Sequence, residues 1–97
     1  MPDDTLAAAF DRALRVVDGA RANGMRTLTG EPAATHLERL RADVVAHRDL
    51  ALERRGVDPE WIRDVVRWVA DWAPAADVTL LAALGAIARH RPTPPAA

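Results

Sequence analysis

The chain has 97 residues, a formal net charge of −1 and no cysteine, and 49% of its residues are hydrophobic. This balance is typical of one small globular domain. It excludes disulfides, thiolate metal sites and cysteine nucleophiles, and the near-neutral charge gives no electrostatic case for nucleic-acid binding. Because serine, lysine and tyrosine are also absent, many common catalytic groups are missing, which favours a protein that is not an enzyme.

The sequence also argues against a membrane protein. Its longest uncharged segment, 78–88, is far shorter than the roughly 20 apolar residues that a helix needs to cross a bilayer. The first residues include acids and lack the basic and apolar regions of a secretory signal. We therefore expect a cytoplasmic protein without membrane contacts.

A first helix is predicted over residues 4–22, where apolar side chains recur at helical spacing on one face and charges occupy the other. Asp3 or Asp4 is expected to cap its N-terminus. Asn23 and Gly24 form a left-handed stop signal at its C-terminus, and a loop should follow.

A second helix is predicted over residues 32–55, with Pro32 at its first position and Gly56 just after its end. At 1.5 Å per residue it would be about 36 Å long, longer than its neighbours can cover. Five residues at spacings typical of a helix–helix seam occupy one face, namely Leu37, Leu40, Val44, His47 and Ala51.

A second apolar patch on this helix consists of Val45 and Leu52, which Arg41 and Arg48 separate from the seam. Exposed apolar patches on a helix mark contacts with further partners. We therefore assign Val45 and Leu52 to a candidate interface.

The third helix, predicted over 59–73, carries all the tryptophans of the chain. Asp58 should cap it and Pro74 should stop it, and the short turn before it predicts an antiparallel hairpin with the second helix. Trp61, Trp68 and Trp72 fall on one ridge. Trp68, in mid-helix, is expected to be the most important for the core, and Trp72, in the last turn, to contact a partner.

The fourth helix is predicted over 77–90, starting after Asp77, with bulky residues on one side and small residues on the other. The proline-rich segment 92–97 cannot continue it and is expected to be a disordered, flexible tail. The sequence thus predicts an all-α fold: a single helical domain, 1–91, built as a four-helix bundle of mainly antiparallel helices.

Candidate chemistry centres on His47, which lies one turn after Asp43, so that the carboxylate can hold and polarise the imidazole. His36 lies on nearly the same side of this helix but about 16 Å from His47 along the axis, too far to share a metal ion with it. No spacing typical of a carboxylate or histidine metal site is present, and we expect neither a metal nor another cofactor.

Five arginines of the second helix suggest a phosphate-binding strip, but interleaved acids favour local ion pairs instead. The fourth helix has almost no polar side chains with which to read base edges. Nucleic-acid binding is therefore disfavoured.

Two functional hypotheses remain. The preferred one is a protein–protein interaction or adaptor module that self-associates or binds another protein through the tryptophan ridge and the patch of Val45 and Leu52. The alternative is a small enzyme or ligand-binding protein with a pocket between the second and third helices, lined by Asp43, His47 and the tryptophans.

Overall fold

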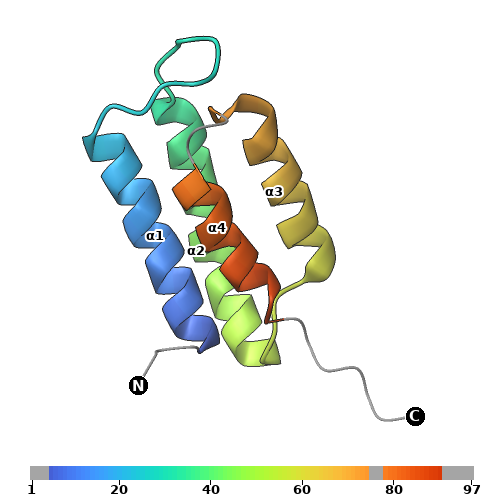
Figure 1. Cartoon of the computed structure of the whole chain (residues 1–97). Helices are drawn as coiled ribbons and strands as arrows, with labels where there is room; N and C mark the ends of the chain where they lie inside the picture. The colour runs from blue at the N-terminus through green and yellow to red at the C-terminus, as the bar shows by residue number, and fades with distance from the viewer. Residues whose placement is uncertain (1–4, 75–77, 91–97) are drawn as a thin grey trace.

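Four segments of the sequence become the four helices of the computed structural model, which describes residues 5–74 and 78–90. They are α1 (Leu6–Ala22), α2 (Ala34–Arg54), α3 (Pro59–Trp72) and α4 (Val78–Ala88). Successive helices run in opposite directions (Figure 1). The predicted all-α, mainly antiparallel bundle is confirmed, and in the described ranges strand pairing is limited to one isolated bridge between Arg26 and Pro32.

Thr5 caps α1, since its side-chain hydroxyl accepts a hydrogen bond from the Ala8 N–H at 3.1 Å. The expected cap at Asp3 or Asp4 is therefore wrong by at least one residue, and those two acids lie outside the described residues. At the other end, Gly24 has a φ of 68° and the Met25 N–H donates to the Ala20 carbonyl at 3.0 Å. This left-handed ending confirms the predicted stop signal.

The loop between α1 and α2 is hydrogen-bonded, and it moves the start of α2 to a later residue than predicted. Pro32 lies opposite Arg26 in the isolated bridge instead of opening the helix. The Thr27 N–H donates to the Glu31 carbonyl at 2.8 Å, which closes a tight turn. We call residues 25–33 the capping loop, because its Leu28 N–H donates to a carbonyl at the end of α3 at 2.9 Å.

The end of α2 differs from the prediction by one residue. The left-handed position is Arg55, with a φ of 59°, and not Gly56. The Gly56 N–H donates to the Ala51 carbonyl at 3.0 Å, which completes the helix ending. A residue other than glycine in this conformation is uncommon and carries backbone strain.

The ends of α3 agree with the sequence. The Asp58 carboxylate accepts the Glu60 N–H at 3.0 Å, and Ala73 becomes extended immediately before Pro74. The described part of α4 begins at Val78, after Asp77 as predicted, and ends at Ala88, two residues before the predicted end at 90. Asp77 itself and the predicted tail, 92–97, lie outside the described residues. The turn between α2 and α3 is tied to the end of α4, because the Val57 N–H donates to the His90 carbonyl at 2.8 Å.

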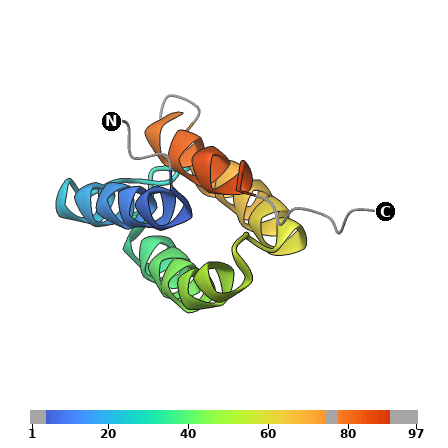
Figure 2. The ribbon, with the colours of Figure 1, turned by 90° about the horizontal axis from the view of Figure 1, so that it is seen from below.

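The closest backbone packing occurs between α1 and α2, between α1 and α4, and between α3 and α4. Viewed along the bundle, the helices surround a common centre in chain order (Figure 2). The largest fully buried side chains belong to all four helices and the turn before α3, namely Phe10, Val17, Leu37, Leu40, Val44, Val57, Val69, Leu80, Leu84 and Ile87. Among the described helices, none is both long enough and apolar enough to cross a bilayer.

Candidate functional site

Aromatic rings fill the space between α2 and α3, whose backbones approach less closely than those of the other neighbouring helices. At the turn end of this layer, the His47 ring stacks on Trp61 with a centroid distance of 4.1 Å and an interplanar angle of 9°. Phe10 of α1 lies parallel to the same indole at 6.3 Å. One tryptophan thus joins three helices.

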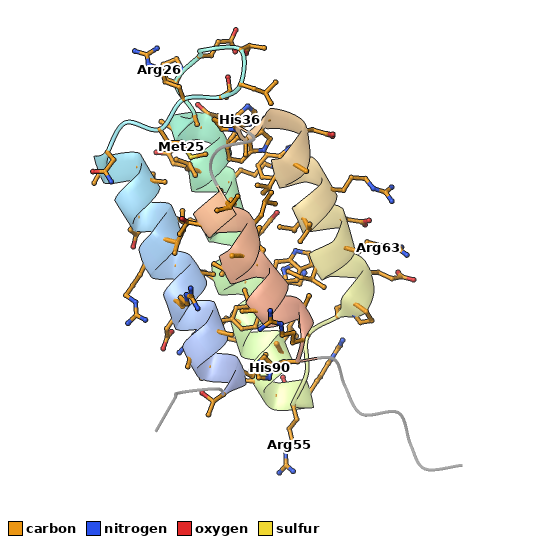
Figure 3. All side chains as sticks on the ribbon, in the orientation of Figure 1. Met25, Arg26, His36, Arg55, Arg63 and His90 are labelled. Carbon is orange, nitrogen blue, oxygen red and sulfur yellow. The ribbon has the colours of Figure 1, made fainter. Side chains whose placement is uncertain are left out.

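At the end of the layer nearest the capping loop, His36 stacks on Trp72 with a centroid distance of 4.9 Å. Trp68 meets His36 edge to face at 5.6 Å and Trp72 at 5.4 Å. The Arg39 guanidinium lies 5.2 Å from the Trp68 ring centre, within range of a cation–π contact. Figure 3 shows His36 at this end of the bundle, beneath the capping loop.

The three tryptophans do not divide as expected. Trp72 is the most buried, with 8% of its surface exposed, whereas Trp61 and Trp68 are half-buried. The capping loop explains this order, because Leu28 hydrogen-bonds to the Trp72 carbonyl and thereby holds the loop over the last turn of α3. Trp68, expected from its mid-helix position to be the most important for the core, is thus less buried than Trp72. The contact of Trp72 with a partner stays a prediction.

His47 and Asp43 do not form the expected pair. The His47 Nδ1 lies 2.9 Å from the main-chain carbonyl oxygen of Asp43 and donates a hydrogen bond to it, so the carboxylate is not the partner. A carbonyl can only accept, which places the proton of the neutral ring on Nδ1. The imidazole is therefore positioned by a main-chain carbonyl of its own helix and by the Trp61 ring.

The cavities beside these rings are small. The one lined by His47 has a volume of about 70 Å³, and the one lined by His36 and Trp72 about 110 Å³. Pockets for small molecules usually measure about 300–1,000 Å³. Within residues 5–74 and 78–90, no group of three or more acidic or histidine side chains is arranged to hold a metal ion.

A larger hollow lies elsewhere, between the first half of α3 and the second half of α4, and has a volume of about 540 Å³. We call it the α3–α4 groove. Its apolar wall consists of Pro59, Ile62, Val66, Gly85 and Ala88, and its charged rim of Glu60 and Arg63. Arg63 points outward from α3 (Figure 3).

The surface of α4 continues this groove. The helix has no charged side chain, although Val78 is 66% exposed and Ala82 is also exposed. A helix that is apolar on all sides is usually covered on all sides. Here the inner side is buried in the core, whereas the outer side is only partly covered: Leu81 and Ala88 are half-buried against the core and Val78 is exposed.

Val45 and Leu52 lie at the surface of α2, 41% and 38% exposed, and sequence reasoning missed the equally exposed Leu50 at 44%. The arginines between the two apolar stripes extend to α1. Arg41 contacts Asp18 at 3.0 Å and Arg48 contacts Asp11 at 3.3 Å. The ion pairs expected within α2 are thus replaced by pairs across the helix–helix interface.

The α3–α4 groove could have been found in the sequence only in part. Val78, Leu81, Gly85 and Ala88 follow the three-four-three spacing of a helix–helix seam. That spacing does not reveal which neighbouring helix leaves the seam uncovered.

Comparison of the chain with protein-family models, curated proteins and solved structures found no match.

Proposed function

We propose that this chain is a protein–protein interaction module that associates with itself. The observation that carries the proposal is the outer side of α4, an uncharged helix face beside an apolar groove of about 540 Å³. Contiguous apolar surface on a small protein marks a contact site. In line with the sequence-based expectation, we propose a cytoplasmic location.

We propose a different face for this interface than the one expected from the sequence. The tryptophan rings already contact histidines of α2, so much of their surface is used within the fold. Val45 and Leu52 lie beside arginines that pair with α1, which gives this patch a charged border. The α4 face has exposed Val78 and no charged residue from 78 to 88, and it is our preferred contact surface.

The alternative, a ligand-binding pocket between α2 and α3, has less support. The cavities that contain His47 or His36 are about 70 and 110 Å³, which is enough for a few water molecules and too small for most metabolites. The α3–α4 groove is large enough, but its polar groups are two rim charges of opposite sign. It lacks the converging polar side chains of a specific small-molecule site.

Sedimentation equilibrium over micromolar to high micromolar concentrations tests the proposal. We expect the apparent mass to rise from that of one 10.5 kDa chain toward that of two. A mass of one chain at all concentrations would contradict self-association.

Two matched substitutions locate the surface. Val78→Glu places a charge on the outer side of α4, while Val45→Glu places one on the exposed side of α2. Both residues are exposed, and a carboxylate in the first turn of α4 is compatible with the helix dipole, so both variants should fold. We expect Val78→Glu to shift the protein toward monomer and Val45→Glu to leave its mass unchanged. The reverse result would assign association to α2.

A further inference from the structure

We propose that two copies of the chain pack α4 against α4 in an antiparallel, two-fold arrangement, with Val78 and Leu81 of each copy entering the α3–α4 groove of the other. This inference rests on the proposed function, because it specifies the partner and the geometry of self-association. A second copy is the favoured occupant because α4 carries both exposed apolar side chains and one wall of the groove that would receive them.

The α4 helix has two seams. The inner seam consists of Leu80, Ala83, Leu84 and Ile87, all buried. The outer seam consists of Val78, Leu81, Gly85 and Ala88, which are exposed or half-buried. Its three-four-three spacing places these four residues on one stripe along the helix, as in helices that pack against another helix.

The outer seam changes in side-chain size from one end to the other. Its first two residues, Val78 and Leu81, are bulky, and its last two, Gly85 and Ala88, are small and line the groove. When two such helices run antiparallel about a point near Ala83, Val78 lies opposite Ala88 and Leu81 opposite Gly85. Each large side chain then meets a small one, and both copies make the same contacts, as a two-fold interface requires.

Gly85 leaves real space for this contact. A Cβ atom added to it would have no neighbouring heavy atom within 4 Å, apart from the backbone of its own helix. Ile62 and Val66 of α3 form the opposite wall of the groove. The incoming side chains would therefore contact two helices at once. The apolar residues of α3 add contact area that the short helix α4 could not supply alone.

Filling the space at Gly85 gives the first test. Gly85→Leu should weaken the dimer by at least about tenfold in dissociation constant, as expected when a well-packed contact is lost. Gly19→Leu is the matched control, because Gly19 also lies within a helix and has no heavy atom near its Cβ position. We expect the control to dimerise like the parent. Equal dissociation constants for all three proteins would overturn the assignment to α4.

Cross-linking gives the second test and uses the absence of cysteine in the chain. Ala82→Cys lies next to the proposed two-fold axis, and Ala46→Cys lies on the exposed surface of α2. With a short bismaleimide, we expect a covalent dimer from Ala82→Cys and little product from Ala46→Cys. Folding of each variant is checked by circular dichroism, and both positions are exposed alanines.

The possible failures are distinct. A parent that sediments as a dimer while Ala82→Cys does not cross-link would overturn the α4 arrangement and leave self-association in place. A parent that remains monomeric would overturn both proposals. If removal of residues 91–97 abolishes the effect of Gly85→Leu, the groove is filled by the chain's own C-terminal segment and the second copy is the wrong occupant.

Discussion

The two flanks of α2 contact their neighbours in opposite ways. Toward α1, three ion pairs lie at the surface, Asp11 with Arg48, Asp18 with Arg41, and Arg21 with Glu38. Toward α3, the contacts are stacked rings that extend from the turn before α3 to the capping loop. The α1 flank has close backbones and charged edges, and the α3 flank has wider spacing and apolar rings.

The two kinds of contact affect different properties of the fold, namely the alignment of the helices and its stability. In the three ion pairs the sum of the two residue numbers is the same, which is the pattern of two antiparallel helices in fixed register. Exposed ion pairs contribute only about 0–1 kcal/mol each. Buried aromatic side chains contribute several times more. We infer that the ion pairs of the α1 flank favour one alignment of α2, while the rings of the α3 flank contribute more to the free energy of unfolding than those ion pairs do.

The largest expected effect comes from Trp72, at the most buried point of the ring layer. Trp72→Ala should lower the free energy of unfolding by about 3–5 kcal/mol, as for other large-to-small changes in a core. Trp68→Ala should cost about 1–2 kcal/mol less, because a half-buried ring leaves a smaller cavity. Urea denaturation of both variants measures the difference. A larger loss for Trp68→Ala would show that mid-helix position outweighs burial by the capping loop.

The ring stack at the other end of the layer should have a smaller effect. His47→Ala removes the ring beside Trp61 and is expected to cost about 1–2 kcal/mol, of which the aromatic pairing itself supplies roughly 0.5–1.5 kcal/mol. His47→Phe keeps a flat ring and loses only the hydrogen bond to the Asp43 carbonyl, so it should recover most of the loss. If both variants are equally destabilised in urea, the hydrogen bond is the important contact and the stack is not.

Trp72 and His47 illustrate which features of the structure the sequence predicts and which it does not. Helical periodicity and the signals at Gly24, Asp58 and Pro74 were sufficient for the four helices and most of their ends. The burial of Trp72 was not predictable from periodicity, because it depends on a loop from elsewhere in the chain. The predicted pairing of His47 with the Asp43 carboxylate was also wrong. Helical spacing brings Asp43 near, but the His47 side chain donates its hydrogen bond to the Asp43 main-chain carbonyl instead.

The candidate site was predictable only as a set of residue types. The sequence shows that α4 has a bulky and a small side, but the groove exists because α3 and α4 leave space near Gly85, and that separation depends on the packing of both helices. The error at the end of α2 is subtler. Gly56 is the expected left-handed residue, yet the helix ends one residue earlier and places Arg55 there.

The end of α2, where its two flanks meet the turn into α3, gives a prediction of opposite sign. Arg55 projects away from the bundle (Figure 3) and has a φ of 59°. Arg55→Gly should raise the free energy of unfolding by about 0.5–1 kcal/mol, since glycine adopts this conformation without strain but loses more entropy on folding. Arg54→Gly, one residue earlier and within the helix, should lower it by about 1 kcal/mol. Thermal denaturation of both variants distinguishes them.

The smallest expected effect lies on the α1 flank, in the ion pair of Asp18 and Arg41. Their side chains are 52% and 43% exposed, so solvent weakens their attraction. A double-mutant cycle with Asp18→Ala and Arg41→Ala should give a coupling energy of about 0.2–1 kcal/mol. The coupling should nearly vanish in 1 M salt, where the screening length falls to about 3 Å.

A control pair on α3 sharpens this measurement. Arg63 and Asp64 are 4.0 Å apart, and 66% and 71% of their side-chain surfaces are exposed. Because they are sequence neighbours in one helix and do not connect two elements, their coupling should be close to zero at any salt concentration. If Asp18 and Arg41 couple no more strongly than this pair, the α1 flank has no measurable electrostatic preference. Its alignment would then come from the apolar residues of α1 and α2 alone, and the distinction between the two flanks of α2 would reduce to how closely their backbones pack.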